Sequence, residues 1–109
     1  PFTDEEMKKI MAHAPYFFPG VMPAGTYKGI PELTMPMLTV YWVAHERVPA
    51  NVVQEILEVV YKDEIKKELA QGYKSWSELE PDTKAFLDLG AKMHAGAEAY
   101  YKAKGLWKE

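Results

Sequence analysis

Residues 22–27 form a short segment in which several groups able to bind a ligand follow one another. The run MPAGTY combines backbone N–H groups, a hydroxyl and a phenol. Because small residues let a ligand approach the backbone, an anion or a polar ligand could bind here. The alternative is a conformationally demanding turn in which Tyr27 serves only for packing. Gly25, Thr26 and Tyr27 are therefore candidate ligand-binding residues.

A second segment of this kind lies near the C-terminus. His94 is followed by the run AGAE and then by Tyr100 and Tyr101. Small residues at the start of a helix let it press against a neighbour, and the unpaired N–H groups of a first turn favour negative charge. Two interpretations stay open, an anion-binding helix start and a close-packed helix end with His94 near the cap.

The residue types used in catalysis and metal binding do not form a recognisable pattern. His13, His45 and His94 are not spaced as metal ligands on one helix, and there is no cysteine. Neither a Gly-x-Ser-x-Gly turn nor a glycine-rich phosphate-binding signature occurs. We therefore predict a protein that is not an enzyme, with no metal site and no cofactor. An enzyme would require His94 to lie beside a carboxylate and an open pocket.

Composition limits the class of protein. Of 109 residues, 48 % are hydrophobic and 13 % aromatic, which is enough for one packed domain and argues against disorder. No stretch approaches the roughly 20 apolar residues of a membrane span. The net charge is −3 and Arg47 is the only arginine, so nucleic acid is not expected as a partner. The lack of cysteine does not indicate a compartment.

The N-terminal part predicts a helix, an irregular segment and a strand. Thr3 and Glu6 have the spacing of a capping box, and Pro15 ends the apolar helical pattern that follows. Residues 16–36 hold four prolines and three glycines among apolar side chains. We expect irregular, buried backbone there, with strands only at an edge, an end or a bulge.

The run Met37–Val43 predicts the main strand, buried on both faces because nearly all of its residues are apolar. Thr34 is the only hydroxyl-bearing residue among the apolar residues that lead into this strand. It is therefore a fourth candidate for ligand binding.

Helices are expected after this strand. Pro49 suits the first position of a helix capped by Gly72. Its apolar stripe is formed by Val53, Ile56, Leu57, Val60, Tyr61, Ile65 and Leu69. Residues 75–79 and 83–89 predict two shorter helical pieces, the second ended by Gly90. The last helix is expected from Ala95 to Lys104, with Ala97, Tyr100 and Tyr101 inward, Gly105 as its cap, and Leu106 and Trp107 folded back onto its final turn.

Three of these segments, taken in order, resemble the C-terminal part of TAXI-family solute receptors, the extracytoplasmic binding subunits of TRAP transporters. The segments are PAGTY, then MPMLTVYWVAHERVPANVVQEILEVVY, then HAGAEAYYKAKG. Glu46, Arg47 and Pro49 match the acidic–basic pair and the proline that follow an apolar strand in that family. The family's closing motif is matched by His94, Gly96, Ala97, Glu98, Tyr100 and Tyr101.

The resemblance implies an α/β chain, the C-terminal fragment of a type II periplasmic-binding-protein fold, with few strands flanked by helices. In that fold a cleft between two lobes holds the ligand. Residues 1–109 would form a single or partial domain, a processed or cut piece that begins at Pro1, and residues 16–36 would be the crossing or hinge segment between the lobes.

The resemblance also implies a function. Members of the family bind a small organic anion or an amino acid, pass it to TRAP membrane permease subunits, and are not enzymes. The chain would be periplasmic or extracytoplasmic. Gly25, Thr26, Tyr27 and Thr34 would contact the ligand.

A second hypothesis is a non-catalytic structural or interaction domain. In this case the apolar strand is exposed and pairs with a second copy of the chain, giving a homo-oligomer. This hypothesis predicts an apolar interface of more than about 1,000 Å² and no ligand cleft.

Overall fold

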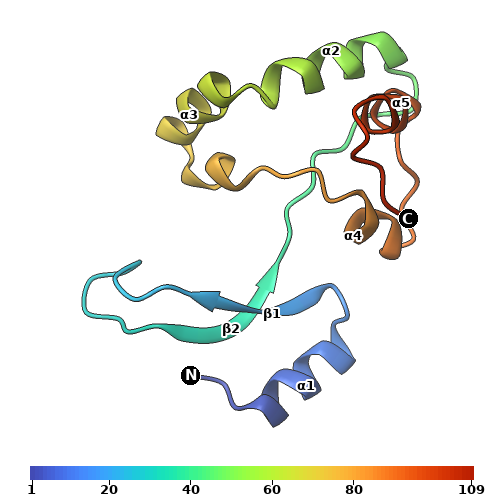
Figure 1. Ribbon diagram of the computed structural model, residues 1–109. Helices are drawn as coiled ribbons and strands as arrows, with labels where there is room; N and C mark the ends of the chain where they lie inside the picture. The colour runs from blue at the N-terminus through green and yellow to red at the C-terminus, as the bar shows by residue number, and fades with distance from the viewer. The chain divides into compact units, whose positions relative to one another are not determined.

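The computed structural model describes residues 1–109 as five α-helices, one 3₁₀-helix and a two-stranded antiparallel sheet (Figure 1). The expected α/β class is confirmed, and the content is consistent with a fragment of a periplasmic-binding-like domain. The chain divides into two compact units, Pro1–Tyr41 with the first helix and the sheet, and Trp42–Glu109 with the other helices. None of the helices has the length and apolar character needed to cross a membrane.

The first helix, α1 (Asp4–His13), begins and ends where the sequence predicts. The capping box is present, because the Glu6 carboxylate accepts a hydrogen bond from the Thr3 N–H (2.8 Å) while the Thr3 hydroxyl accepts one from the Glu6 N–H (3.3 Å). The helix stops before Pro15, which disfavours helical backbone in the residue that precedes it. Met7 on the apolar face is buried.

The expectation of irregular, buried backbone over residues 16–36 is wrong in part, because β1 (Phe17–Met22) and the first residues of β2 (Leu33–Leu38) pair as a hairpin, and none of the residues 16–36 is buried. In the antiparallel register Pro19 lies opposite Pro36. Both strands are edges of a two-stranded sheet, which confirms that proline restricts strands here to edges. Neither proline has an N–H, so this rung is a pair without ladder hydrogen bonds.

The predicted strand Met37–Val43 is wrong beyond Leu38, where β2 ends. Val40 and Val43, expected to be buried, are 79 % and 81 % exposed. The partner strand is too short. Leu38 already pairs with Phe17, the first residue of β1, and the chain before Phe17 leads back to α1, so no backbone is left to pair with residues beyond Leu38. An apolar, β-prone run does not form a strand without a partner backbone.

The single helix expected after Pro49 consists of two helices, α2 (Ala50–Val60) and α3 (Asp63–Gly72). They are separated at Lys62, whose backbone is extended (φ −67°, ψ 132°). The two valines that end α2 are β-branched and lower its helix propensity, while the two acidic residues that begin α3 favour a new helix start. These local preferences explain why the apolar stripe does not continue as one helix.

The remaining elements are η1 (Lys74–Glu78), a 3₁₀-helix, α4 (Thr83–Asp88) and α5 (Ala95–Ala103). Gly90 and Gly105 follow α4 and α5 with φ of 77° and 70°, as predicted for helix ends. The Leu106 N–H donates to the Tyr101 carbonyl at 2.8 Å, so the chain folds back on the last turn of α5. Gly72 is not the predicted cap, because it is the last residue of α3 and Tyr73 caps the helix.

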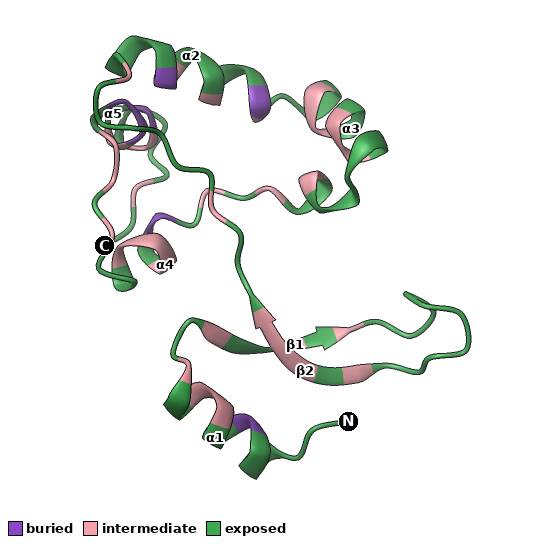
Figure 2. Ribbon diagram, turned by 180° about the vertical axis from the view of Figure 1, so that it is seen from behind, coloured by how far each residue is buried: buried purple, intermediate pink, exposed green.

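The core of the second unit lies between α2 and α5, which pack side by side (Figure 1). Val53 and Val60 of α2 and Ala97 and Tyr100 of α5 are buried (Figure 2). The predicted stripe also included Ile56, which is 42 % exposed. That prediction is wrong because α2 is apolar around more of its circumference than one neighbouring helix covers.

Candidate functional site

The loop that joins β1 to β2 holds three of the four predicted ligand-binding residues. Gly25 has a φ of 81°, a left-handed conformation that glycine adopts without strain. Its N–H donates to the Ile30 carbonyl (3.2 Å), and the Ile30 N–H donates to the Tyr27 carbonyl (3.1 Å). The loop is thus closed by its own backbone, and its conformation requires glycine at position 25.

Thr26 uses both of its donors inside this loop. Its hydroxyl donates to the Pro23 carbonyl at 2.8 Å, and its N–H is 3.3 Å from the same oxygen. The hydroxyl oxygen keeps lone pairs that can accept a further hydrogen bond. Thr26 can therefore offer a ligand an acceptor more readily than a donor.

Tyr27 presents the most accessible polar group of the loop. The residue is 65 % exposed, and its phenol makes no hydrogen bond within the chain. Lys28 follows it, is also exposed and has no salt-bridge partner. Lys28 is not among the candidates predicted from the sequence, although a cation next to a phenol in a glycine-containing turn is a usable signal for binding an anion.

Thr34 lies on the hairpin itself. It is exposed on β2 and pairs with Val21, one rung beyond the Met22–Leu33 pair that closes the loop. No hydrogen bond joins its side chain to Gly25, Thr26 or Tyr27. The structure therefore places three candidates together in the loop and the fourth on the adjoining strand.

The start of α5 is closely packed. His94 is the N-cap, and its Nδ1 accepts a hydrogen bond from the Gly96 N–H at 3.1 Å. The other ring nitrogen, Nε2, lies 3.0 Å from the Val48 carbonyl and donates to it in the neutral ring. A Cβ on Gly96 would lie 2.9 Å from the Cα of Ala50. These contacts support the interpretation of this segment as a close-packed helix end with His94 at the cap.

Three tyrosines meet where the C-terminal end of α2 faces α5. The hydroxyls of Tyr61 and Tyr101 lie 2.9 Å apart, and the rings of Tyr61 and Tyr100 stack with centroids 6.0 Å apart. Burial raises the pKa of Tyr61, and the hydrogen bond with Tyr101 raises it further. Burial also raises the pKa of Tyr100, and the nearby Glu58 carboxylate adds to this. The phenols of Tyr61 and Tyr100 are thus held protonated, so they act as packing and hydrogen-bonding groups and not as bases.

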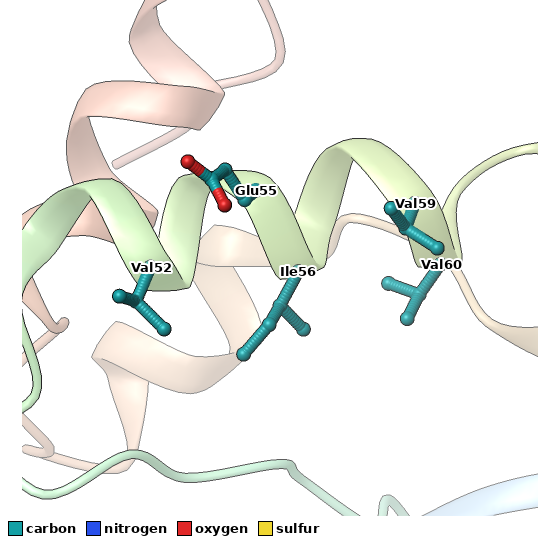
Figure 3. Close-up of a pocket in the computed structure, with 5 residues that line it drawn as sticks. All are labelled: Val52, Glu55, Ile56, Val59 and Val60. Carbon is teal, nitrogen blue, oxygen red and sulfur yellow. The ribbon is translucent and has the colours of Figure 1, made fainter.

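A shallow hollow of about 330 Å³ lies along α2. Its lining comes from that helix alone and is apolar except for Glu55 (Figure 3). The exposed aliphatic residues of this hollow are Val52, Ile56 and Val59. None of the predicted ligand-binding residues lies in it.

A second hollow, of about 230 Å³, is lined by Glu80, Pro81, Asp82 and Lys108. The Asp82 carboxylate is engaged there as the N-cap of α4, because it accepts from the Ala85 N–H at 3.0 Å. No group of three or more histidine, cysteine, aspartate or glutamate side chains is arranged to hold a metal ion. The hairpin loop is thus the site that gathers the candidate residues.

Comparison with protein families gives one result that bears on function. The model of the NMT1-like family matches residues 1–105, which is nearly the whole chain. No solved structure gives a significant match.

Proposed function

Because the chain belongs to the NMT1-like family, whose members are solute-binding proteins of the periplasmic-binding type, we propose that it is part of a TAXI-type receptor of a TRAP transporter. The family match over residues 1–105 is the observation that carries this proposal. The order of the PAGTY, HERVP and HAGAEAYY segments supports the narrower assignment. Proteins of this family are generally not enzymes and are typically extracytoplasmic.

The proposed ligand is a small organic anion or an amino acid, bound with the help of the hairpin loop. Tyr27 would donate its phenol proton to a carboxylate, and the Lys28 ammonium would supply a favourable charge. Thr26 would accept from a ligand amine or hydroxyl, since its own proton is committed to Pro23. Thr34 would add a hydroxyl from β2, and Gly25 would keep the loop backbone accessible.

Residues 16–36 are proposed as the crossing segment that acts as a hinge between two lobes. The composition of the segment supports this role, because its four prolines and three glycines limit its regular structure to a two-stranded hairpin joined by a long loop. Closure of the lobes would then enclose the solute and form the surface that the TRAP permease subunits recognise.

Calorimetric titration of the 109-residue chain with succinate and with L-glutamate tests the ligand class. The proposal expects binding of at least one of these probes. Replacement of Tyr27 by alanine should weaken that binding about tenfold, the loss of one good hydrogen bond to a charged group. Tyr73→Ala is the matched control, because Tyr73 is 64 % exposed but lies outside the hairpin.

Two results would count against the proposal. Absence of binding across short carboxylic acids and amino acids would remove the ligand class. Equal affinities of the Tyr27→Ala variant and the unaltered chain would remove Tyr27 from the site and leave it a loop residue only.

The second candidate function is a homodimer that forms through the apolar segment after β2. It is favoured by the exposure of Val40, Trp42 and Val43, of which Trp42 is 67 % exposed. Pro19 and Pro36 oppose it, because they remove an outward N–H from the middle of each edge of the hairpin. Sedimentation at high concentration separates the two functions, since a compact monomer would exclude the dimer.

A further inference from the structure

Residues 27–30 form a β-turn in the loop between β1 and β2. The Ile30 N–H donates to the Tyr27 carbonyl at 3.1 Å, which closes the turn. Gly29, at the third position, has a φ of 79°, whereas no residue other than glycine has a positive φ in the chain. This combination identifies a type II turn, which favours glycine or asparagine at its third position.

The backbone donors inside this turn are free, in contrast to those of the turn that precedes it in the same loop. In the preceding turn, Thr26 commits both its N–H and its hydroxyl to the Pro23 carbonyl. The N–H groups of Lys28 and Gly29 make no hydrogen bond within the chain. Both residues are exposed, so a ligand can reach this part of the loop.

The need for glycine at position 29 arises from the backbone alone. A Cβ on Gly29 would meet no atom within 4 Å, so no neighbouring group excludes a larger side chain. A β-branched residue, however, avoids a positive φ. It would favour a type I turn, which keeps the bond between Ile30 and Tyr27 but turns the central peptide over and reverses the direction of the N–H of residue 29.

The charge at this turn suits an anion. Lys28, at the second position, carries an ammonium group that has no salt-bridge partner. Glu32 is the only carboxylate of the loop, and it forms no ion pair with Lys28. A ligand carboxylate accepts strong hydrogen bonds from backbone N–H groups, and a nearby cation adds to them. Free amides and an ammonium on consecutive residues therefore match the carboxylate of the proposed ligand.

We propose that residues 27–30 recognise one carboxylate of the ligand through the backbone N–H groups of Lys28 and Gly29 and through the Lys28 ammonium. Gly29 positions these donors, because it holds the turn in the type II form. The inference rests on the proposed function and deepens it, since it assigns recognition of the carboxylate to a particular turn of the loop and adds Gly29 to the residues on which binding depends.

Calorimetric titration with succinate and with L-glutamate tests two substitutions in the 109-residue chain. Gly29→Asn should bind like the unaltered chain, because asparagine tolerates the left-handed conformation. Gly29→Val should bind about tenfold more weakly, the loss of one hydrogen bond to a charged group. Gly90→Val is the matched control and should bind normally. Gly90 also has a positive φ, of 77°, and open space around it, but it lies in the second unit.

NMR of the backbone amides separates contact with the ligand from a general effect on the fold. In the unaltered chain and in Gly29→Asn, the amide protons of residues 28 and 29 should shift when the ligand is added. Equal affinities of the asparagine and valine variants would overturn the inference and leave the proposed function in place. Amide protons at both positions that stay constant while the ligand binds would do the same. If neither probe binds to the unaltered chain, the proposed ligand class and this inference fail together.

Discussion

The Cα of Ala50 lies 2.9 Å from the position that a Cβ on Gly96 would occupy, so the first turns of α2 and α5 touch backbone to backbone. Only glycine allows this approach. Gly96→Ala should force the two helices apart and lower the free energy of unfolding by about 1–3 kcal/mol, the usual cost of overpacking. All three tryptophans belong to the second unit, so urea denaturation followed by tryptophan fluorescence measures the effect.

Gly72→Ala is the matched control for this substitution. A Cβ on Gly72 would meet nothing within 4 Å, and the residue ends α3 without a left-handed backbone. Alanine at a helical position reduces the entropy of the unfolded chain, so this variant should be as stable as the unaltered chain or up to about 1 kcal/mol more stable. Equal destabilisation by both substitutions would show that the contact with Ala50 is not the cause.

The hydroxyl pair of Tyr61 and Tyr101 predicts a dependence on alkaline pH. The pKa of Tyr61 is raised in the folded chain, chiefly by burial and then by its bond to Tyr101. The neutral phenol is therefore favoured by folding, and this stability is complete below pH about 10, the ordinary value, and lost as the pH rises above it. Absorbance titration at the phenolate band should show that Tyr61 ionises above the ordinary value for tyrosine.

Tyr101→Phe tests the cause of this shift. Removal of the partner hydroxyl should lower the pKa of Tyr61 without restoring its ordinary value, because the burial remains. Tyr73→Phe, on an exposed residue, should leave the late ionisation unchanged. A Tyr101→Phe variant with the same late titration would show that the hydrogen bond has no part in the shift.

Local features were predictable from the sequence, and tertiary ones were not. The capping box of Thr3 and the helix ends at Gly90 and Gly105 depend on a few neighbouring residues, and all three are confirmed. The strand expected to continue to Val43 fails because its partner ends, which no local pattern reveals. The exposure of Ile56 has the same origin, since periodicity identifies an apolar helix face but not how much of it a neighbour covers.

The candidate site likewise has local features that could be predicted from the sequence and three-dimensional contacts that could not. The MPAGTY run contains the glycine that the loop conformation requires, so the loop could be located from its composition. The commitment of the Thr26 hydroxyl to the Pro23 carbonyl is a matter of geometry and changes what that residue can offer a ligand. The link between His94 and Val48 joins residues that are far apart in the sequence, and only the His94 cap could be predicted.

A fall in pH should weaken the capping box at the N-terminus of α1. Hydrogen bonds from the backbone and the hydroxyl of Thr3 lower the pKa of Glu6. The charged carboxylate is thus favoured in the folded chain, so this contribution is present above the ordinary value of 4.5 and lost as the pH falls below it. In Thr3→Ala the pKa of Glu6 should rise toward 4.5, which carboxyl-detected NMR titration measures. An unchanged Glu6 titration in that variant would exclude the Thr3 hydroxyl as a cause, because the backbone N–H of residue 3 is still present.

Thr83 should hold the C-terminal tail against α4, because its side chain is almost fully buried, with 1 % exposed. Its hydroxyl donates to the Lys108 carbonyl and accepts from the Lys108 N–H, both at 2.8 Å. Thr83→Val keeps the shape but leaves two backbone groups without partners, so the second unit should lose about 1–3 kcal/mol of stability. The Lys108 amide should exchange faster in this variant, whereas Thr39→Val, at an exposed position, should change neither quantity. Unaltered exchange at Lys108 in Thr83→Val would mean that the tail is held by other contacts.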